Sequence, residues 1–305
     1  ADLISEKQPN YQYVAARLLL MDLRKQVYKQ LNPIPFEYLV KNNIYRGVYD
    51  KVLLEKYNQQ DLVYFSKHIN YDRDFKFTFA GMSQMVDKYL LQDRITGELY
   101  ETPQEAFMLI GMFMFMNYEK KQRKEYVVKL YDALSTFKIS LPTPIMSGVR
   151  TPLRQFSSCC LIDVGDSLES IMNSNTAVGY YTAHRAGIGL NFGRIRGIDA
   201  QIRNGEVVHT GLVPFLKIFE ASTKGFTQNS VRGGGSTSTL PFFHWEIETF
   251  IQLKNNKGND ENRVRRMDYS IALNKLFRER VKNNENITLF SSEETRELYE
   301  LFYSS

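Results

Sequence analysis

The chain has 305 residues, of which 43% are apolar and 24% are charged, and its formal net charge is +5. This composition is typical of a globular protein with a hydrophobic core, and the length allows two domains or one large one. The basic excess is small and spread along the chain, which fits anionic small molecules. It disfavours a duplex nucleic acid, because duplex binding requires clustered Lys and Arg, so we expect no DNA partner.

The cysteine content limits the redox chemistry and the location of the protein. The chain has two cysteines, Cys159 and Cys160, and they are adjacent. An adjacent pair cannot close a long loop, so a secreted disulfide scaffold is excluded and a reducing cytosol is expected. The histidines show no ligand spacing, so no metal site is expected. No secretory leader is visible at Ala1, and the longest apolar run, 106–116, is too short to span a bilayer, so no membrane partner is expected.

The first part of the chain is predicted to be helical. Apolar residues recur every three to four positions from Tyr13 to Val27, with lysines on the other face. A hairpin is predicted around residues 93–97, where Gly97 occupies the tight position. Further helices are predicted over residues 34–42, 79–89, 102–117 and 123–136.

The pattern changes near residue 140, where Pro142 and Pro144 are expected to exclude a helix. Beyond this point, apolar segments alternate with helical ones, which indicates parallel α/β packing. We therefore predict two domains, 1–145 and 146–305. The predicted strands are 155–162, 187–192, 236–240, 268–274 and 287–290, and the predicted helices are 167–183, 212–224 and 244–254.

Residues 154–162 place two thiols at the end of a small polar stretch on a predicted strand. Neighbouring side chains of a strand point to opposite faces, so one thiol can face a cleft while the other packs in the core. The pattern alone favours a simpler interpretation, in which Cys159 and Cys160 are both small buried residues. A bond between the two would be strained, and we expect none.

Two glycine-rich segments are candidate ligand sites. In residues 185–197, glycines let the backbone approach a phosphate and nearby arginines can neutralise it. A strand flanked by turns explains this segment equally well, and it lacks the helix that follows a dinucleotide fingerprint. In residues 231–238, three successive glycines indicate either a flexible connection or a mobile lid over a ligand.

Asp166 precedes the helix predicted from Ser167, and capping of that helix is the favoured interpretation of its carboxylate. Alternatively, this carboxylate can accept hydrogen bonds from a ribose hydroxyl.

In order and spacing, these segments resemble the large subunit of class I ribonucleotide reductase, of the enterobacterial and T4-like phage type. The resemblance covers essentially the whole chain. It implies an α/β fold in which a helical N-terminal domain, with the family's ATP-cone largely absent, is followed by the first half of a ten-stranded α/β barrel. The matching segments are 11–18, 135–159, 185–193, 209–211, 231–234, 253–258 and 263–269.

The resemblance implies the N-terminal part of an oxidoreductase for deoxyribonucleotide synthesis and DNA replication. The family reduces ribonucleoside diphosphates by thiyl-radical chemistry with a redox-active pair of cysteines. Cys159 matches one member of that pair, whereas Cys160 stands where the family usually has an aliphatic residue. The radical cysteine and the redox partner of Cys159 would belong to a C-terminal part that these residues do not include.

The resemblance also assigns candidate binding residues. The substrate residues are Thr143, Ser158, Gly187 and Arg232. The residues for the allosteric dNTP or ATP effector, which the family binds with Mg²⁺, are Asp166, Ser167, Leu168, Arg196 and Arg203. The loop that relays effector identity to the substrate matches Gln228, Asn229, Ser230, Val231, Gly233 and Gly234. Asn229 and Ser230 replace the usual pair of glycines, and Gly235 and Ser236 replace small apolar residues.

The implied partners complete the enzyme. One partner is the C-terminal half of the large subunit, on a second polypeptide if the subunit is split, and another is the small subunit, whose metal cofactor supplies the radical. A second copy of the reassembled large subunit would pair through helices 167–183 and 212–224. Thioredoxin or glutaredoxin would reduce the enzyme. A phage-encoded chain would act in the host cytoplasm. The alternative is a non-catalytic dNTP-binding regulatory fragment that assembles with no other half. A nucleic-acid-binding role is disfavoured, because the chain lacks a basic stripe with interleaved aromatic residues.

Overall fold

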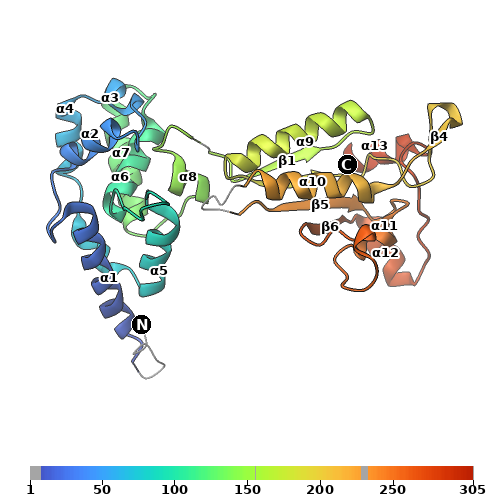
Figure 1. Ribbon diagram of the computed structural model, residues 1–305, viewed down its shortest axis with the longest axis horizontal. Helices are drawn as coiled ribbons and strands as arrows, with labels where there is room; N and C mark the ends of the chain where they lie inside the picture. The colour runs from blue at the N-terminus through green and yellow to red at the C-terminus, as the bar shows by residue number, and fades with distance from the viewer. Residues whose placement is uncertain (1–7, 155, 228–232, 305) are drawn as a thin grey trace. The chain divides into compact units, whose positions relative to one another are not determined.

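The computed structural model describes residues 8–154, 156–227 and 233–304. The chain forms two compact units, Ala1–Ser157 and Ser158–Ser305, each with its own hydrophobic core. The first unit is helical and the second is built on a parallel sheet (Figure 1). This order confirms the predicted fold class. The domain boundary predicted after residue 145 stays a prediction; it falls within a helix that packs in the first unit.

Helix α6 forms the centre of the helical unit. It starts with a capping box between Thr102 and Glu105 and carries apolar side chains around nearly its whole circumference, so it is buried on almost all sides. The described helices of this unit are α1 (Tyr11–Tyr28), α2 (Phe36–Tyr45), α3 (Val52–Lys56), α4 (Gln59–Ser66), η1 (Tyr71–Lys76), α5 (Phe79–Gln84), the π-helix η2 (Met85–Tyr89), α6 (Pro103–Phe115), α7 (Lys120–Ser135) and α8 (Thr143–Gly148).

Helix α8 corrects the expectation that two prolines exclude a helix near residue 140. Pro142 precedes the helix, and Pro144 lies in its first turn. A backbone N–H in the first turn has no partner within the helix, so a proline there removes no hydrogen bond. By contrast, the predicted hairpin is confirmed, because Gln92 and Leu99 form an antiparallel bridge and Gly97 has a φ of 75°.

The buried side chain of Arg150 ties α8 to η2. Its guanidinium forms an ion pair with Glu101, which is also buried. It further donates hydrogen bonds to the carbonyl oxygens of Met146 in α8 (2.7 Å) and Tyr89 in η2 (2.9 Å). Because the charges and the donors of this guanidinium are satisfied, the burial of an arginine is tolerated and the two segments are held together.

The second unit contains a parallel sheet in which consecutive strands are neighbours, as in the opening part of a barrel. Its order is β1 (Cys159–Asp163), β2 (Gly187–Asn191), β5 (Ser236–Pro241) and β6 (Asp268–Ala272). Helix α9 (Leu168–Ala183) connects β1 to β2, and helix α10 (Leu212–Gly225) lies in the connection from β2 to β5; the two helices lie side by side (Figure 1). The other described elements are the ribbon β3 (Gln201–Ile202) and β4 (Val207–Val208) with η3 (Arg203–Gly205) between them, α11 (Ile247–Ile251), η4 (Asp260–Asn262), α12 (Lys275–Asn283) and α13 (Arg296–Ser304).

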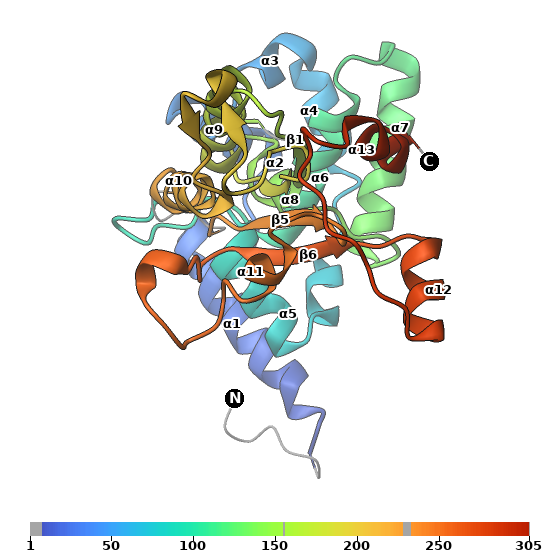
Figure 2. The same cartoon turned by 90° about the vertical axis from the view of Figure 1, so that its right-hand side faces the viewer.

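The two faces of the sheet have different environments. Ile188 and Leu190 of β2 are buried in a core that includes apolar residues of α9 and α10. Side chains one position away along a strand point to the opposite face. On β1 this second face carries Leu161, whose side chain is 86% exposed. Figure 2 shows β5 and β6 running side by side, which continues the sheet away from β1. The face that α9 and α10 do not cover is therefore open.

The predicted strand 287–290 is wrong, because residues 287–289 are irregular and Phe290 forms one isolated bridge to His244. The backbone of Phe290 forms hydrogen bonds with the turn after β5. The Phe290 N–H donates to the Phe243 carbonyl oxygen (2.8 Å), and the Phe290 carbonyl oxygen accepts from the Trp245 N–H (2.7 Å). Ile287 and Phe290 join an aromatic cluster with Phe243 and Tyr299, whereas Leu289 packs against the core of the sheet. The helix predicted over 244–254 is confined to α11.

Candidate functional sites at the two ends of the parallel sheet

Ser158, Cys159 and Gly187 lie together at the amino-terminal edge of the sheet. Cys159 pairs with Gly187 in the register of β1 and β2, and the Gly187 N–H donates to the Ser158 carbonyl oxygen (2.8 Å). Gly235, just before β5, accepts a hydrogen bond from the Ile188 N–H (3.0 Å). Because Gly187 has no side chain, the backbone beside Cys159 is open to a ligand.

The two thiols face opposite sides of β1. Cys159 is exposed on the open face, whereas Cys160 is half-buried and packs against the core beneath α9 and α10. Burial, with a smaller contribution from the neighbouring Cys159, raises the pKa of the Cys160 thiol. The thiolate is the reactive form, so the environment of Cys160 makes it a poor nucleophile. A disulfide between the two would require distortion of the strand.

The end of the glycine-rich segment is held at the same edge of the sheet. The Gly234 N–H donates to Thr227 Oγ1 (2.8 Å), and its carbonyl oxygen accepts from Lys224 Nζ (2.9 Å). A Cβ on Gly234 would lie 2.1 Å from Thr227 Oγ1 and 2.4 Å from the Thr223 carbonyl oxygen, so only glycine fits. Gly233 has open space around it. The other loop residues predicted to act, Gln228, Asn229, Ser230, Val231 and Arg232, lie outside the described residues.

A second candidate site lies beyond the opposite, carboxyl-terminal edge of β1 and β2. The Asp166 carboxylate accepts hydrogen bonds from the backbone N–H of Arg196 (3.1 Å) and from its Nε (2.8 Å). This hydrogen-bonded pair raises the pKa of the Arg196 guanidinium. The two residues line a cavity of about 450 Å³, a volume typical of small-molecule sites. The other lining residues are Gly165, Ser167, Arg194, Ser292, Glu293, Arg296, Tyr299 and Glu300.

Two arginines of this cavity, Arg194 and Arg296, were not among the predicted effector residues, although Arg194 belongs to the segment 185–197 in which arginines were expected to neutralise a phosphate. Arg194 pairs with Asp163 (2.7 Å) and Glu300 (2.5 Å), while Arg296 has no carboxylate within ion-pair distance among the described residues. The sequence signal for Arg194 was its place two residues before Arg196, on the other side of the apolar Ile195. The structure shows that Ile195 is fully buried between the two arginines. Arg296 comes from α13, about a hundred residues further along the chain, and no local pattern connects it to β1 or β2.

Asp166 does not cap α9, contrary to the favoured interpretation. The N-cap is Ser167, whose hydroxyl accepts a hydrogen bond from the Ser170 N–H (3.1 Å). Because Ser167 satisfies the start of the helix, the Asp166 carboxylate is available to Arg196. Leu168 is the first residue of α9, and its side chain is 74% exposed.

The structure does not bring every predicted site residue together. Arg203 is absent from the lining of the cavity; it lies in the turn between β3 and β4, with a φ of 52° and Glu206 as its nearest ion-pair partner at 3.8 Å. Thr143 belongs to the helical unit, where it is the half-buried first residue of α8. Ser158, Cys159 and Gly187 form one group, and Asp166, Ser167 and Arg196 form the other.

Comparison with known proteins identifies the family of both units. The family profile described as "Ribonucleotide reductase, all-alpha domain" matches residues 75–154, and the profile described as "Ribonucleotide reductase, barrel domain" matches residues 157–304. The chain belongs to the large-subunit family of ribonucleotide reductases. The border between the two ribonucleotide reductase profiles coincides with the division between the helical unit and the α/β unit.

Relatives within the ribonucleotide reductase family match over the whole chain. The identity is 49% with the ribonucleoside-diphosphate reductase subunit alpha of Buchnera aphidicola subsp. Schizaphis graminum. It is 48% with the ribonucleoside-diphosphate reductase 1 subunit alpha of Escherichia coli K12, and 47% with the corresponding subunit alpha of Enterobacteria phage T4. Each match covers 100% of this chain and 40% of the relative, so the chain spans about two fifths of the length of these relatives.

Among the described residues, no helix combines the length and the apolar character that crossing a membrane requires.

Proposed function

We propose that the chain is the amino-terminal part of the large subunit of a ribonucleoside-diphosphate reductase, an oxidoreductase that converts ribonucleoside diphosphates to deoxyribonucleotides. The observation that carries this proposal is the exposed Cys159 thiol on the open face of a parallel sheet, beside Gly187, in a chain of this family. Together, Ser158, Cys159 and Gly187 offer a thiol and an unobstructed backbone to the ribose of a substrate.

The proposed role of Cys159 follows from the electron balance of the reaction. Replacement of the ribose 2′-hydroxyl by hydrogen consumes two electrons and two protons and releases water. Two thiols supply both when they join in a disulfide, and thioredoxin or glutaredoxin would then reduce that disulfide by thiol exchange. Cys159 provides one thiol. Cys160 cannot provide the other, because it faces the core on the opposite side of the strand.

The second redox thiol and the thiol that carries the radical would therefore belong to another part of the large subunit. The chain has no cysteine besides Cys159 and Cys160. We propose that a second polypeptide carries the remaining part and pairs with the open sheet. The radical would be supplied by the metal cofactor of the small subunit, and this chain's own task is to bind the substrate and to donate one hydrogen equivalent.

The cavity at the carboxyl-terminal edge is the proposed effector site. Arg194, Arg196 and Arg296 place three guanidinium groups in the cavity wall, and their positive charges suit the phosphates of a nucleoside triphosphate. Arg194 and Arg196 are also paired with carboxylates of this chain, which hold them in position. Asp166 and Glu293 offer carboxylate oxygens, the ligands that Mg²⁺ prefers, so the residues present fit an ATP or dNTP effector with its metal ion. Strand β2 runs between the two sites, with Gly187 at one end and Asn191 at the other.

We also propose that two reassembled large subunits pair through α9 and α10. Both helices expose large apolar side chains away from the core, which a monomer would leave in water. These side chains are Leu168, Met172, Tyr180 and Tyr181 of α9 and Ile218 of α10.

The test of the function uses the chain assembled with the complementary polypeptide and the small subunit. We expect Cys159→Ser to abolish deoxyribonucleotide formation, because one redox thiol is lost, while dNTP binding is retained. Cys160→Ser is the matched control, and we expect it to keep most of the activity. Product formation is measured by chromatography of the nucleotides. Equal losses in the two variants would contradict the assignment, as would turnover by the Cys159→Ser enzyme.

A further inference from the structure

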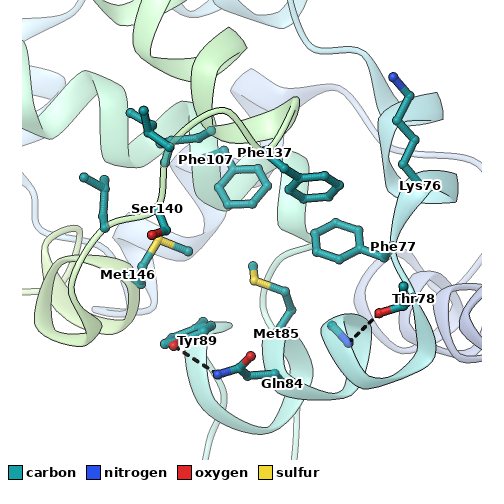
Figure 3. A pocket seen from close by; sticks show the side chains of 14 residues that line it. Lys76, Phe77, Thr78, Gln84, Met85, Tyr89, Phe107, Phe137, Ser140 and Met146 are labelled. Carbon is teal, nitrogen blue, oxygen red and sulfur yellow. Dashed lines mark hydrogen bonds between the residues drawn. The ribbon is translucent and has the colours of Figure 1, made fainter.

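The helical unit contains an apolar cavity that neither candidate site uses. Its volume is about 400 Å³, and it is lined by α5, η2, α6, the end of α7 and the segment that leads into α8 (Figure 3). The side chains that define it are aromatic rings and thioethers, namely Phe77, Phe107, Phe137, Met85 and Met146. In Figure 3 the rings of Phe77 and Phe137 face the space above Met85.

The walls of this cavity are held in place by polar contacts behind them. Arg150 donates hydrogen bonds to the carbonyl oxygens of Met146 and Tyr89, which fixes α8 against η2. Gln84 Nε2 donates to the hydroxyl of Tyr89 (3.3 Å), as the dashed line in Figure 3 shows. Phe107, at the base, is almost completely buried. The cavity is therefore formed in the free protein, which lowers the entropic cost of binding a ligand.

Phe137 occupies a backbone position that favours glycine. Helix α7 ends at Ser135, and two hydrogen bonds close its end: Lys138 N–H to the Ala133 carbonyl oxygen (2.9 Å) and Phe137 N–H to the Leu134 carbonyl oxygen (3.0 Å). This is the Schellman arrangement, in which the residue after the C-cap is left-handed and is usually glycine. Phe137 adopts it with a φ of 61°, although a side chain there is strained.

The strained conformation holds an aromatic ring at the mouth of the cavity. The Phe137 ring packs edge-on against Phe77, with centroids 4.8 Å apart and an interplanar angle of 76°. Even so, the Phe137 side chain remains 48% exposed, so burial within this chain does not account for it. A half-exposed ring at a position where glycine would be more stable is explained if the ring serves as a binding surface.

We propose that this cavity binds a small, neutral, planar aromatic molecule of one or two rings. Aromatic rings and thioether sulfurs favour such a ligand, because they contact ring faces and edges. Polar lining groups are few; Gln84 and Ser140 lie at the edge and suit one or two hydrogen bonds with the ligand. The ammonium of Lys76 points away from the rings in Figure 3, so no anionic group is required.

This inference is independent of the proposed reductase activity, because every lining residue belongs to the helical unit. Its failure and that of the proposed function are therefore distinguishable. The cavity also contacts the helix that begins at Thr143, through Met146.

The test is a titration of the whole chain with indole, followed by NMR of methionine methyl groups labelled with ¹³C. A bound aromatic ring shifts nearby methyl signals through its ring current, so we expect saturable shifts of Met85 and Met146. Met21 and Met172 are exposed elsewhere and serve as internal controls that should stay unchanged. Shifts confined to the control methionines, or non-saturable shifts of all of them, would overturn the proposal.

A pair of glycine substitutions separates the binding role of Phe137 from a structural one. Phe137→Gly relieves the strained conformation and removes the ring, so we expect unchanged or higher stability together with indole affinity weakened about fivefold. Lys29→Gly is the matched control, because Lys29 is left-handed at the end of α1 with the same φ of 61°. We expect it to leave indole affinity unchanged. Unaltered affinity in Phe137→Gly would refute the role of the ring.

A further experiment tests whether the complementary polypeptide, and not a small molecule, fills the cavity. The indole titration is repeated after the complementary large-subunit polypeptide has been added. We expect the shifts of Met85 and Met146 to persist. Loss of these shifts would show that the second polypeptide fills the cavity, and the small-molecule proposal would then be wrong.

Discussion

Asp74 is a carboxyl group in the core of the helical unit. Its Oδ1 accepts a hydrogen bond from Gln104 Nε2 (2.9 Å), and the nearest cation is Arg24, whose Nη2 lies 3.6 Å from Oδ2. Burial raises the pKa of Asp74 to about 7, and the contacts with Gln104 and Arg24 only partly oppose this shift. Asp74 thus contributes to a dependence of the stability of the helical unit on pH.

The sign of this dependence follows from the raised pKa. Between about pH 4 and pH 7 the folded state retains a proton that the unfolded chain has released, so the free energy of unfolding falls as pH rises. The slope due to Asp74 is at most about 1.4 kcal/mol per pH unit. We expect Asp74→Asn to make the measured slope shallower by at most about 1.4 kcal/mol per pH unit, which corresponds to one proton. Some slope should remain, because the pKa of Glu105 is also about 7.

Urea unfolding of the chain at a series of pH values between 5 and 8 measures this slope. Asp72→Asn is the matched control, since Asp72 lies two residues away and is exposed. We expect the control to keep the slope of the unaltered chain. Equal slopes for Asp74→Asn and the unaltered chain would mean that Asp74 is ionised in the folded state.

At the scale of elements, the parallel register decides which residues meet. Strands β1, β2 and β5 begin at one edge of the sheet, so Cys159, Gly187 and the end of the glycine-rich segment come together there. The segments after β1 and β2 leave from the other edge, and they carry Asp166 and Arg196. The two proposed sites are therefore joined by the strands themselves.

Arg196 is the residue of the proposed effector site whose loss can be tested most directly. We expect Arg196→Ala to weaken the binding of Mg²⁺–dNTP about tenfold or more, because a charge-assisted hydrogen bond to phosphate is lost and Asp166 is left without its partner. Arg265→Ala is the control, since Arg265 pairs with Asp260 outside the cavity. Binding is measured by calorimetry with each dNTP on the assembled enzyme. The same affinity in both variants would place the effector elsewhere.

At the scale of the whole molecule, the α/β unit presents surfaces that water does not favour. Strands β1 and β6 are the outer strands of the described sheet, so each has one edge without a neighbouring strand. Large apolar side chains are exposed on β1 and around α12 and α13, namely Leu161, Leu273, Leu276, Val281, Leu298 and Leu301. Unpaired strand edges and apolar patches promote association with another chain.

We therefore expect the chain alone to self-associate and to form a defined complex when the complementary polypeptide is added. Size-exclusion chromatography with light scattering gives the mass of each species. The complex is expected because strands of the second polypeptide would pair with the unpaired edges of β1 and β6 and would cover the open face of the sheet. The test variant is Leu161→Ser, which places a polar group on the open face and should weaken the complex. A chain that remains monomeric with and without the second polypeptide would contradict this expectation.

Helical periodicity and the alternation of apolar strands with helices were sufficient to predict α1, α2, α5, α6 and α7 and all four strands of the sheet, because burial of one face is a local property of the sequence. The short helices α3 and α4 were not predicted. The order of the motifs was sufficient to place the chain in its family. The effect of Pro142 and Pro144 on α8 was misjudged, since a proline just before a helix or in its first turn is tolerated, whereas a proline inside the helix is not. Residues 287–290 had the composition of a strand, but the backbone partners of Phe290 belong to the turn after β5.

A helical part, an α/β part and two adjacent thiols, one of which can face outward, were predictable from the amino-acid sequence. The joining of Arg194 and Arg296 with Asp166, the capping of α9 by Ser167 and the position of Phe137 over a cavity became visible in the folded chain alone. Periodicity records how each segment is buried, whereas a site depends on contacts between segments far apart in the chain. Those contacts are set by strand register and helix packing, which no single segment encodes.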